Sequence, residues 1–93
     1  MKYTVERDIQ TIEQLNRVLL NLPHFCNAFF IGIEQTTSPL TRLGYARDLE
    51  IFFNYLIQEI ETFNQYQIAD FEKDDLNKIT IDDIELYLVA LLA

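Results

Sequence analysis

This 93-residue chain has few of the residues that make turns, bridges and positive surfaces. It contains one cysteine (Cys26), two glycines, two prolines and no tryptophan. A single cysteine excludes an internal disulfide bond and a zinc site built from several cysteines. The scarcity of glycine and proline disfavours a β-sandwich with many turns, and no segment alternates apolar and polar residues as a strand would. These absences favour a helical fold.

The chain also lacks a long apolar run. No unbroken apolar stretch approaches the roughly 20 residues that a membrane-spanning helix needs. The amino terminus, MKYTVERDIQ, is charged and does not resemble a signal peptide. At this length the chain makes one domain at most, with a modest core. We therefore expect a soluble, cytoplasmic domain without a membrane partner.

Positive charge is scarce and unevenly placed. The 15 acidic and seven basic residues give a formal net charge of −8, which on average disfavours nucleic-acid binding. Residues 1–47 hold five basic and four acidic residues, whereas residues 48–93 hold two basic and eleven acidic ones. The two halves therefore carry +1 and −9. A polyanion would meet less repulsion at the first half.

Apolar residues recur at three- and four-residue spacing in four segments, which predicts four helices. We expect the first over residues 8–21, ended by Pro23, and the second from Pro23 to about Ile33. The third should begin after Ser38 and continue for about six turns, and the fourth should begin after Thr80. The polar residues 62–78 between the last two should be pinned by scattered apolar side chains and form a short helical turn. The predicted fold class is all-α, a compact bundle of four main helices.

Capping residues support the predicted starts of the third and fourth helices. Ser38 can cap the third helix, with Pro39 at its first position. Thr80 and Asp83 have the spacing of a capping box at the fourth. Gly44 interrupts the third helix at a cost of about 1 kcal/mol against alanine. It indicates either the close approach of a neighbouring helix or ligand, or a tolerated imperfection.

No arrangement of residues predicts catalysis. His24 and Cys26 lie two positions apart, so on a helix they would point about 200° from each other and could not act together. We expect a surface histidine and a buried cysteine. The pairs Asp74–Asp75 and Asp82–Asp83 lack the glycine and ligand spacing of a calcium loop, and helix capping explains them better. We expect no catalytic residue, metal or cofactor in this chain.

The start of the third helix is the candidate site. A capped helix start carries a positive dipole and free N–H groups that suit anions. Thr41 adds a hydroxyl, and Arg42 and Arg47 add charges that suit phosphate oxygens or guanine edges. Five positions apart, the two arginines are separated by about 140° around the axis, so they form no single stripe. The alternative is two ordinary arginines that pair with acids such as Asp48.

The same segment carries a family pattern. It resembles the amino-terminal core-binding domain of tyrosine recombinases and phage integrases, a SAM-like helical module. The segments LPHFCNAFF and LNKITIDDIELYLVAL resemble the neighbouring helices of that module, in the right order. The residues that match the pattern in the third helix are Ser38, Thr41, Tyr45, Asp48, Leu49 and Phe52.

The resemblance implies a function. Residues 1–93 would be a single core-binding domain, with an N-terminal helix over 1–21 and a SAM-like core over 22–93 that ends before the family's last helix. Without that helix, Leu88 and Leu91 would be exposed or covered by the first helix. The domain would clamp a double-stranded DNA recombination site together with a separate catalytic domain of the same parent protein, and it would also meet other recombinase protomers. It would perform no chemistry itself.

The resemblance also assigns roles to residues. The DNA-binding residues would be Ser38, Thr41, Arg42 and Arg47, while Tyr45 belongs to the apolar stripe and is expected in the core. A second hypothesis is an acidic helical protein–protein interaction module whose acidic half docks on a basic partner. In that case neutralising Asp82 and Asp83 should matter more than changing the arginines.

Overall fold

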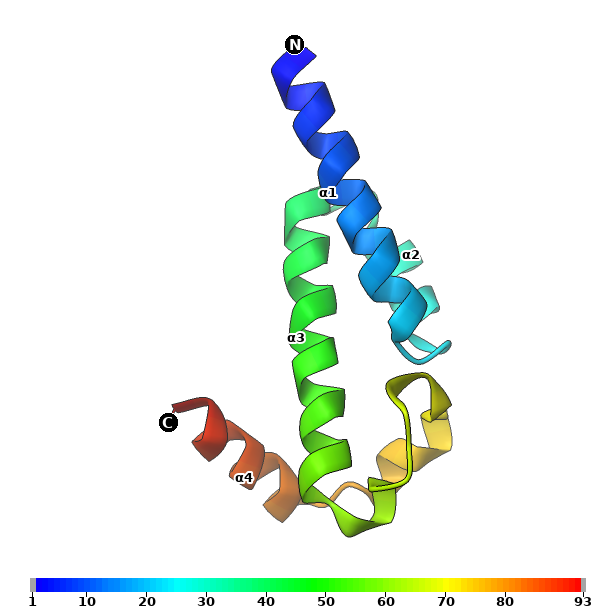
Figure 1. Ribbon diagram of the computed structural model, residues 1–93, viewed down its shortest axis with the longest axis vertical. Helices are drawn as coiled ribbons and strands as arrows, with labels where there is room; N and C mark the ends of the chain where they lie inside the picture. Colours follow the sequence, from blue (N-terminus) through cyan, green and yellow to red (C-terminus); the bar gives the residue numbers. More distant parts are fainter. Residues whose placement is uncertain (1, 93) are drawn as a thin grey trace.

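The computed structural model describes residues 2–92, with side chains from residue 6 onward. Four α-helices carry the architecture: α1 (Lys2–Asn21), α2 (Cys26–Ile33), α3 (Pro39–Glu59) and α4 (Ile81–Leu92) (Figure 1). Three short 3-10 helices join α3 to α4: η1 (Glu61–Phe63), η2 (Ile68–Asp70) and η3 (Lys73–Lys78). Residues 2–92 contain no strand. The prediction of an all-α chain with four main helices is confirmed.

The helix boundaries differ from the prediction at two places. The first helix is longer and begins at Lys2. The second was expected to start at Pro23, but Pro23–Phe25 form a turn, in which the amide of Cys26 donates to the carbonyl of Pro23 at 3.0 Å. Helix α2 then begins at Cys26 and has only eight residues. The expectation for its start was wrong because Pro23 is used to reverse the chain after α1.

The predicted caps are present. The Ser38 hydroxyl accepts from the amide of Thr41 at 3.2 Å, and α3 continues for 21 residues. At α4 the amide of Thr80 donates to Asp83 Oδ2 at 2.9 Å, and the amide of Asp83 donates to Thr80 Oγ1 at 3.1 Å. Each helix start thus satisfies its free amides with a side chain three residues away.

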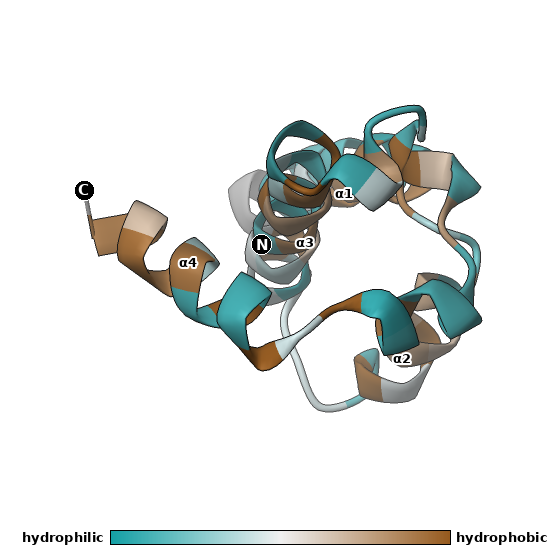
Figure 2. Ribbon diagram, turned by 90° about the horizontal axis from the view of Figure 1, so that it is seen from below, coloured by the Kyte–Doolittle hydropathy of each residue, from teal (hydrophilic) through white to brown (hydrophobic). Residues whose placement is uncertain are grey.

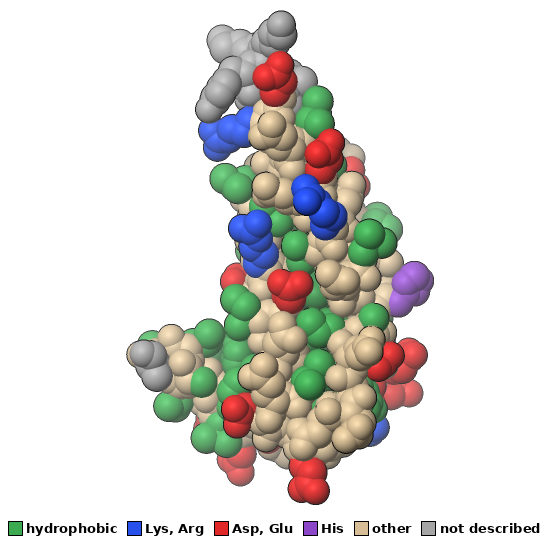
Figure 3. Space-filling model, in the orientation of Figure 1, with side chains coloured by type: hydrophobic (Ala, Val, Ile, Leu, Met, Phe, Trp, Pro, Cys, Tyr) green, Lys and Arg blue, Asp and Glu red, His purple; other side chains and the backbone are tan. Residues whose placement is uncertain are grey.

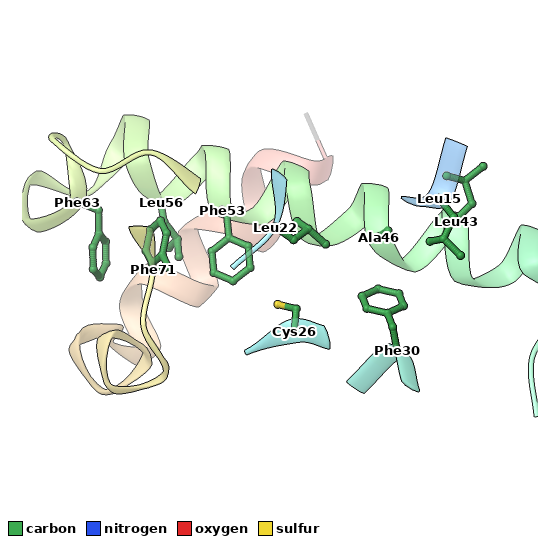
Figure 4. Packing of buried hydrophobic residues seen from close by; sticks show 10 residues of the cluster. All are labelled: Leu15, Leu22, Cys26, Phe30, Leu43, Ala46, Phe53, Leu56, Phe63 and Phe71. Carbon is green, nitrogen blue, oxygen red and sulfur yellow. The ribbon is translucent and has the colours of Figure 1, made fainter. Parts of the chain in front are cut away.

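Helix α3 is the central element. Helix α1 crosses one side of α3, α2 packs behind the two, and the 3-10 helices close the lower end (Figure 1). Figure 4 shows the buried cluster along α3. Phe53 of α3 stacks on Phe71, and Phe71 on Phe63, with ring centroids 4.9 Å apart in both pairs. The polar segment before α4 is therefore pinned to α3 by aromatic rings.

Helix α4 lies apart from this body. It projects from the lower end of α3, away from α1 and α2, in both ribbon views (Figures 1 and 2). The molecule measures 49 × 28 × 22 Å with a radius of gyration of 15.1 Å, whereas a compact domain of this length would have about 12 Å. The expected compact packing therefore holds for the body but not for α4. Of the alternatives for Leu88 and Leu91, the structure has them exposed.

One side chain joins α4 to the body. Tyr87 lies edge-on to Phe52 and Tyr55 of α3, with ring centroids at 5.0 and 5.1 Å. Burial, and after it the nearby carboxylate of Asp48, raises the pKa of Tyr87. An aromatic anchor of this kind fixes the base of α4 and leaves the remaining face without cover.

Candidate nucleic-acid interface

The start of α3 exposes two hydroxyl groups. The Ser38 hydroxyl donates to Thr41 Oγ1 at 3.0 Å while it accepts from the Thr41 amide, so the two side chains form one cap. Pro39 has no N–H group, and Leu40 N is left without a hydrogen-bond partner among the described residues. One amide and the Thr41 hydroxyl hydrogen therefore remain available to an oxygen-rich ligand at this helix start.

Arg42 points into the molecule. It is only 8% exposed, and its Nη1 donates to the carbonyl of Glu34 at 2.9 Å and to the carbonyl of Thr37 at 2.6 Å. A third contact reaches Thr37 Oγ1 at 3.3 Å. The guanidinium thus ties the first turn of α3 to the link that follows α2. The direct DNA contact expected of Arg42 stays a prediction, and the geometry gives this side chain a positioning role.

Arg47 points outward. Its side chain is exposed, and no carboxylate pairs with it among residues 6–92. The ion pair present in that part of the chain joins Lys78 to Asp75 at 2.9 Å. The alternative in which Arg42 and Arg47 pair with an acid such as Asp48 is therefore wrong for the described side chains. The structure brings Ser38 and Thr41 together, but it separates Arg42 from Arg47.

Two further cations lie on α1. Arg7 and Arg17 are exposed, and α1 packs along α3. Figure 3 shows Lys and Arg side chains on the upper part of one face, where α1 crosses α3, with Asp and Glu side chains among them. Sequence reasoning counted these arginines in the less acidic half but did not assign them to the site. The missing signal was tertiary, because only the crossing of two helices places α1 beside Arg47.

Tyr45 is not in the core. It is 44% exposed, and its ring lies 6.4 Å from that of Phe29, centroid to centroid. The expectation of a core tyrosine was wrong because α1 and α2 cover the side of α3 that carries Leu43 and Ala46. The apolar stripe of α3 is wider than the surface that its neighbours bury.

The remaining titratable groups have structural roles. Asp75 accepts from the amide of Glu72 at 2.8 Å, from Lys78 at 2.9 Å and from the Tyr66 hydroxyl at 3.0 Å. The backbone hydrogen bond and then Lys78 lower the pKa of the Asp75 carboxyl. Burial raises the pKa of the Cys26 thiol, which keeps it protonated. Among residues 6–92, no three His, Cys, Asp or Glu side chains are grouped closely enough to hold a metal ion.

No protein-family model matches this chain, and no curated protein or solved structure is significantly similar to it. None of the helices within residues 2–92 has both the length and the apolar character that crossing a bilayer requires. Function must therefore be inferred from the residues and their geometry.

Proposed function

We propose that this chain is the non-catalytic, DNA-clamping core-binding domain of a site-specific tyrosine recombinase. The observation that carries the proposal is the first three turns of α3, where the Ser38–Thr41 cap is exposed at the helix start and the unpaired Arg47 is exposed in the third turn, on a helix whose residues resemble the family pattern. The all-helical fold with four main helices is compatible with a SAM-like module. In this role the domain positions DNA for a catalytic domain elsewhere in the parent protein.

Each group at this surface has a defined task in the proposal. The Thr41 hydroxyl donates to a phosphate oxygen, because the Ser38 hydroxyl hydrogen is already given to Thr41 Oγ1. Arg47 contributes a charge-assisted hydrogen bond to phosphate or to a guanine edge. Arg42 holds the helix start in place from inside. Arg7 and Arg17 add two exposed cations on α1, beside the exposed carboxylates of Glu6, Asp8 and Glu13.

The charge distribution sets the strength of binding. Three exposed arginines on α1 and α3 neutralise few phosphates, so we expect weak binding. A plot of the logarithm of the binding constant against the logarithm of the salt concentration should have a slope of about −3. The formal charge of −8 opposes binding at every other surface. Most of the affinity of a full recombinase would therefore come from the catalytic domain, while this domain contributes orientation.

A charge reversal tests the proposal. Anisotropy of a labelled DNA duplex at low salt should show binding by the protein, and Arg47→Glu should weaken it about tenfold or more. The matched control is Lys73→Glu, which changes the net charge equally on η3, away from α3's start. If both variants weaken binding to the same degree, or if neither does, the proposed contact surface is refuted. Circular dichroism should show both variants folded, because both side chains are exposed.

A second candidate function is favoured by a different observation. Helix α4 is acidic at its start and exposes most of its apolar side chains, as expected of a protein-interaction module. This function uses the end of the molecule opposite to the arginines. The two functions therefore do not compete for the same residues.

A further inference from the structure

Helix α4 exposes far more apolar surface than its own chain covers. Ile84, Leu88 and Leu91 recur at four- and three-residue spacing and share one face, and all three are exposed. Leu88 alone is 53% exposed. The other exposed apolar side chains of the helix are Ile81, Leu86, Val89 and Leu92. Exposed apolar surface that is contiguous over several side chains marks an interaction site in a protein that folds stably.

This face continues onto α3. Tyr87 packs on Phe52, and the same side of α3 carries Leu49 and Tyr45 one and two turns earlier. A hollow of about 230 Å³ lies there, between Phe29, Tyr45, Leu49 and Asp48. Figure 3 shows hydrophobic side chains along the junction of the projecting helix with the body. The α3–α4 corner is defined by Phe29, Tyr45, Leu49, Phe52, Ile84, Leu88 and Leu91.

The charges around the α3–α4 corner are predominantly negative. Helix α4 carries Asp82, Asp83 and Glu85 and no basic residue, and Asp48 lines the hollow on α3. Asp83 caps the helix and Asp82 points about 120–180° away from Ile84, Leu88 and Leu91, so the acidic border of the corner consists of Glu85 and Asp48. An apolar surface with an acidic rim is complementary to an apolar surface with a basic rim.

A second copy of this chain does not fit these charges. Two α4 helices packed through this apolar face would bring Glu85 of each copy to the interface, without a cation from either helix. Each chain also has a net charge of −8, so association is opposed at long range. The occupant must supply positive charge of its own.

We propose that the α3–α4 corner is a docking site for a basic amphipathic helix of another protein. The apolar side of that helix lies against Leu88, Leu91 and the α3 hollow, and its Lys or Arg residues meet Glu85 and Asp48. This is the helix-in-groove mode of recognition, in which anchors at i, i+3 or i+4 and i+7 enter an apolar surface. It shares no residue with the proposed DNA contact, although Tyr45 lies one turn after Thr41 on α3, and it does not depend on that contact.

A synthetic helix tests the docking site. The probe is a fluorescein-labelled 18-residue peptide of Leu and Lys, arranged with one apolar and one basic face. Its counterpart has Glu in place of every Lys. Anisotropy should show saturable binding of the Leu/Lys peptide, weaker at high salt, and no binding of the Leu/Glu peptide. Amide chemical-shift changes should concentrate on α4 and on the turns of α3 that carry Tyr45 and Phe52.

Matched variants separate the corner from general attraction to an acidic protein. Leu88→Ser should weaken binding about tenfold, since its exposed apolar area is then no longer buried by the peptide. The control is Ile9→Ser, because Ile9 is 51% exposed and belongs to α1. Asp48→Asn with Glu85→Gln should weaken binding several-fold at low salt, unlike Asp8→Asn with Glu13→Gln on α1.

Three results would overturn the proposal. The first is an equal loss from Ile9→Ser and Leu88→Ser, which would mean that the peptide binds without regard to the corner. The second is a set of chemical-shift changes that lies mainly on α1 or α2. The third is a protein that is dimeric by light scattering and becomes monomeric with Leu88→Ser, since a second copy would then occupy the corner. These side chains are exposed, so the variants should keep the wild-type circular dichroism spectrum.

Discussion

Replacement of Arg42 by methionine should destabilise the fold, although arginine is ordinarily a surface residue. Methionine keeps the length and the apolar stem of the side chain but cannot donate hydrogen bonds. The variant therefore loses the two charge-assisted bonds to the carbonyls of Glu34 and Thr37, at 2.9 and 2.6 Å. Each such bond contributes about 1.5–3 kcal/mol. Water can reach the carbonyls once the guanidinium is gone, so we expect a net loss of about 2–4 kcal/mol.

The loss expected for Arg42→Met is large relative to the total free energy of unfolding. A domain of this size has a free energy of unfolding of about 5–14 kcal/mol, so Arg42→Met should remain folded at 25 °C but melt about 10–25 °C lower. Urea unfolding followed by circular dichroism at 222 nm measures the difference. The stability of Arg42→Lys should lie between those of the wild type and Arg42→Met. The lysine ammonium can reach one of the two carbonyls but cannot form the same fork.

Arg47→Met is the matched control. This side chain is exposed and unpaired among the described residues, so its loss should change the free energy of unfolding by less than about 0.5 kcal/mol. If Arg42→Met unfolds at the same urea concentration as the wild type, the guanidinium does not hold the link after α2, and the reasoning is refuted. The comparison also matters for the DNA experiment, because a destabilised Arg42 variant loses DNA binding through loss of the fold and not through loss of a contact.

Two further predictions concern local features. Gly44→Ala should raise the free energy of unfolding by about 1 kcal/mol in thermal or urea unfolding, because alanine favours the helix. A Cβ at Gly44 would meet nothing within 4 Å; an unchanged or lower stability would contradict the open space seen there. Asp75→Asn should destabilise the protein at neutral pH, and Asp74→Asn serves as its exposed neighbour control. The folded-state pKa of Asp75 lies below the ordinary 3.8, so its stabilising effect is complete above that value and is lost as the pH falls through the lowered pKa. The melting temperatures of wild type and Asp75→Asn should therefore converge toward pH 3, and a constant difference from pH 7 to pH 3 would exclude this cause.

The open space beside Gly44 decides between the two interpretations of that residue. Neither a neighbouring helix nor any other part of the described chain approaches it. Within this chain, the glycine is a tolerated imperfection of α3. Any close approach would have to come from a bound partner.

Local chemistry was readable from the sequence. The Ser38 cap, the Thr80–Asp83 capping box and the helical spacing of apolar residues all depend on contacts three or four positions apart. Such contacts form within one segment, so the sequence of that segment is sufficient to predict them. The all-α class and the four main helices follow from the same local rules.

Tertiary structure alone decided what each helix face meets. The apolar stripe of α3 includes Tyr45 and Leu56 alike, yet Tyr45 is exposed and Leu56 is fully buried. Arg42 is buried because the link after α2 turns two carbonyls toward it, whereas Arg47 is exposed and pairs with no carboxylate among residues 6–92. Periodicity states that a face is apolar, but the positions of the neighbouring helices determine which part of it is covered.

The positions of neighbouring helices also explain why one side of α3 is covered while α4 is not. An eight-residue α2 and a crossing α1 are enough to bury one side of α3. No segment among residues 2–92 lies over the apolar face of α4, because the single aromatic anchor at Tyr87 directs that helix away from the body. The sequence by itself determined that α4 is an apolar and acidic helix. The path of the chain decided that its apolar side remains available to a partner.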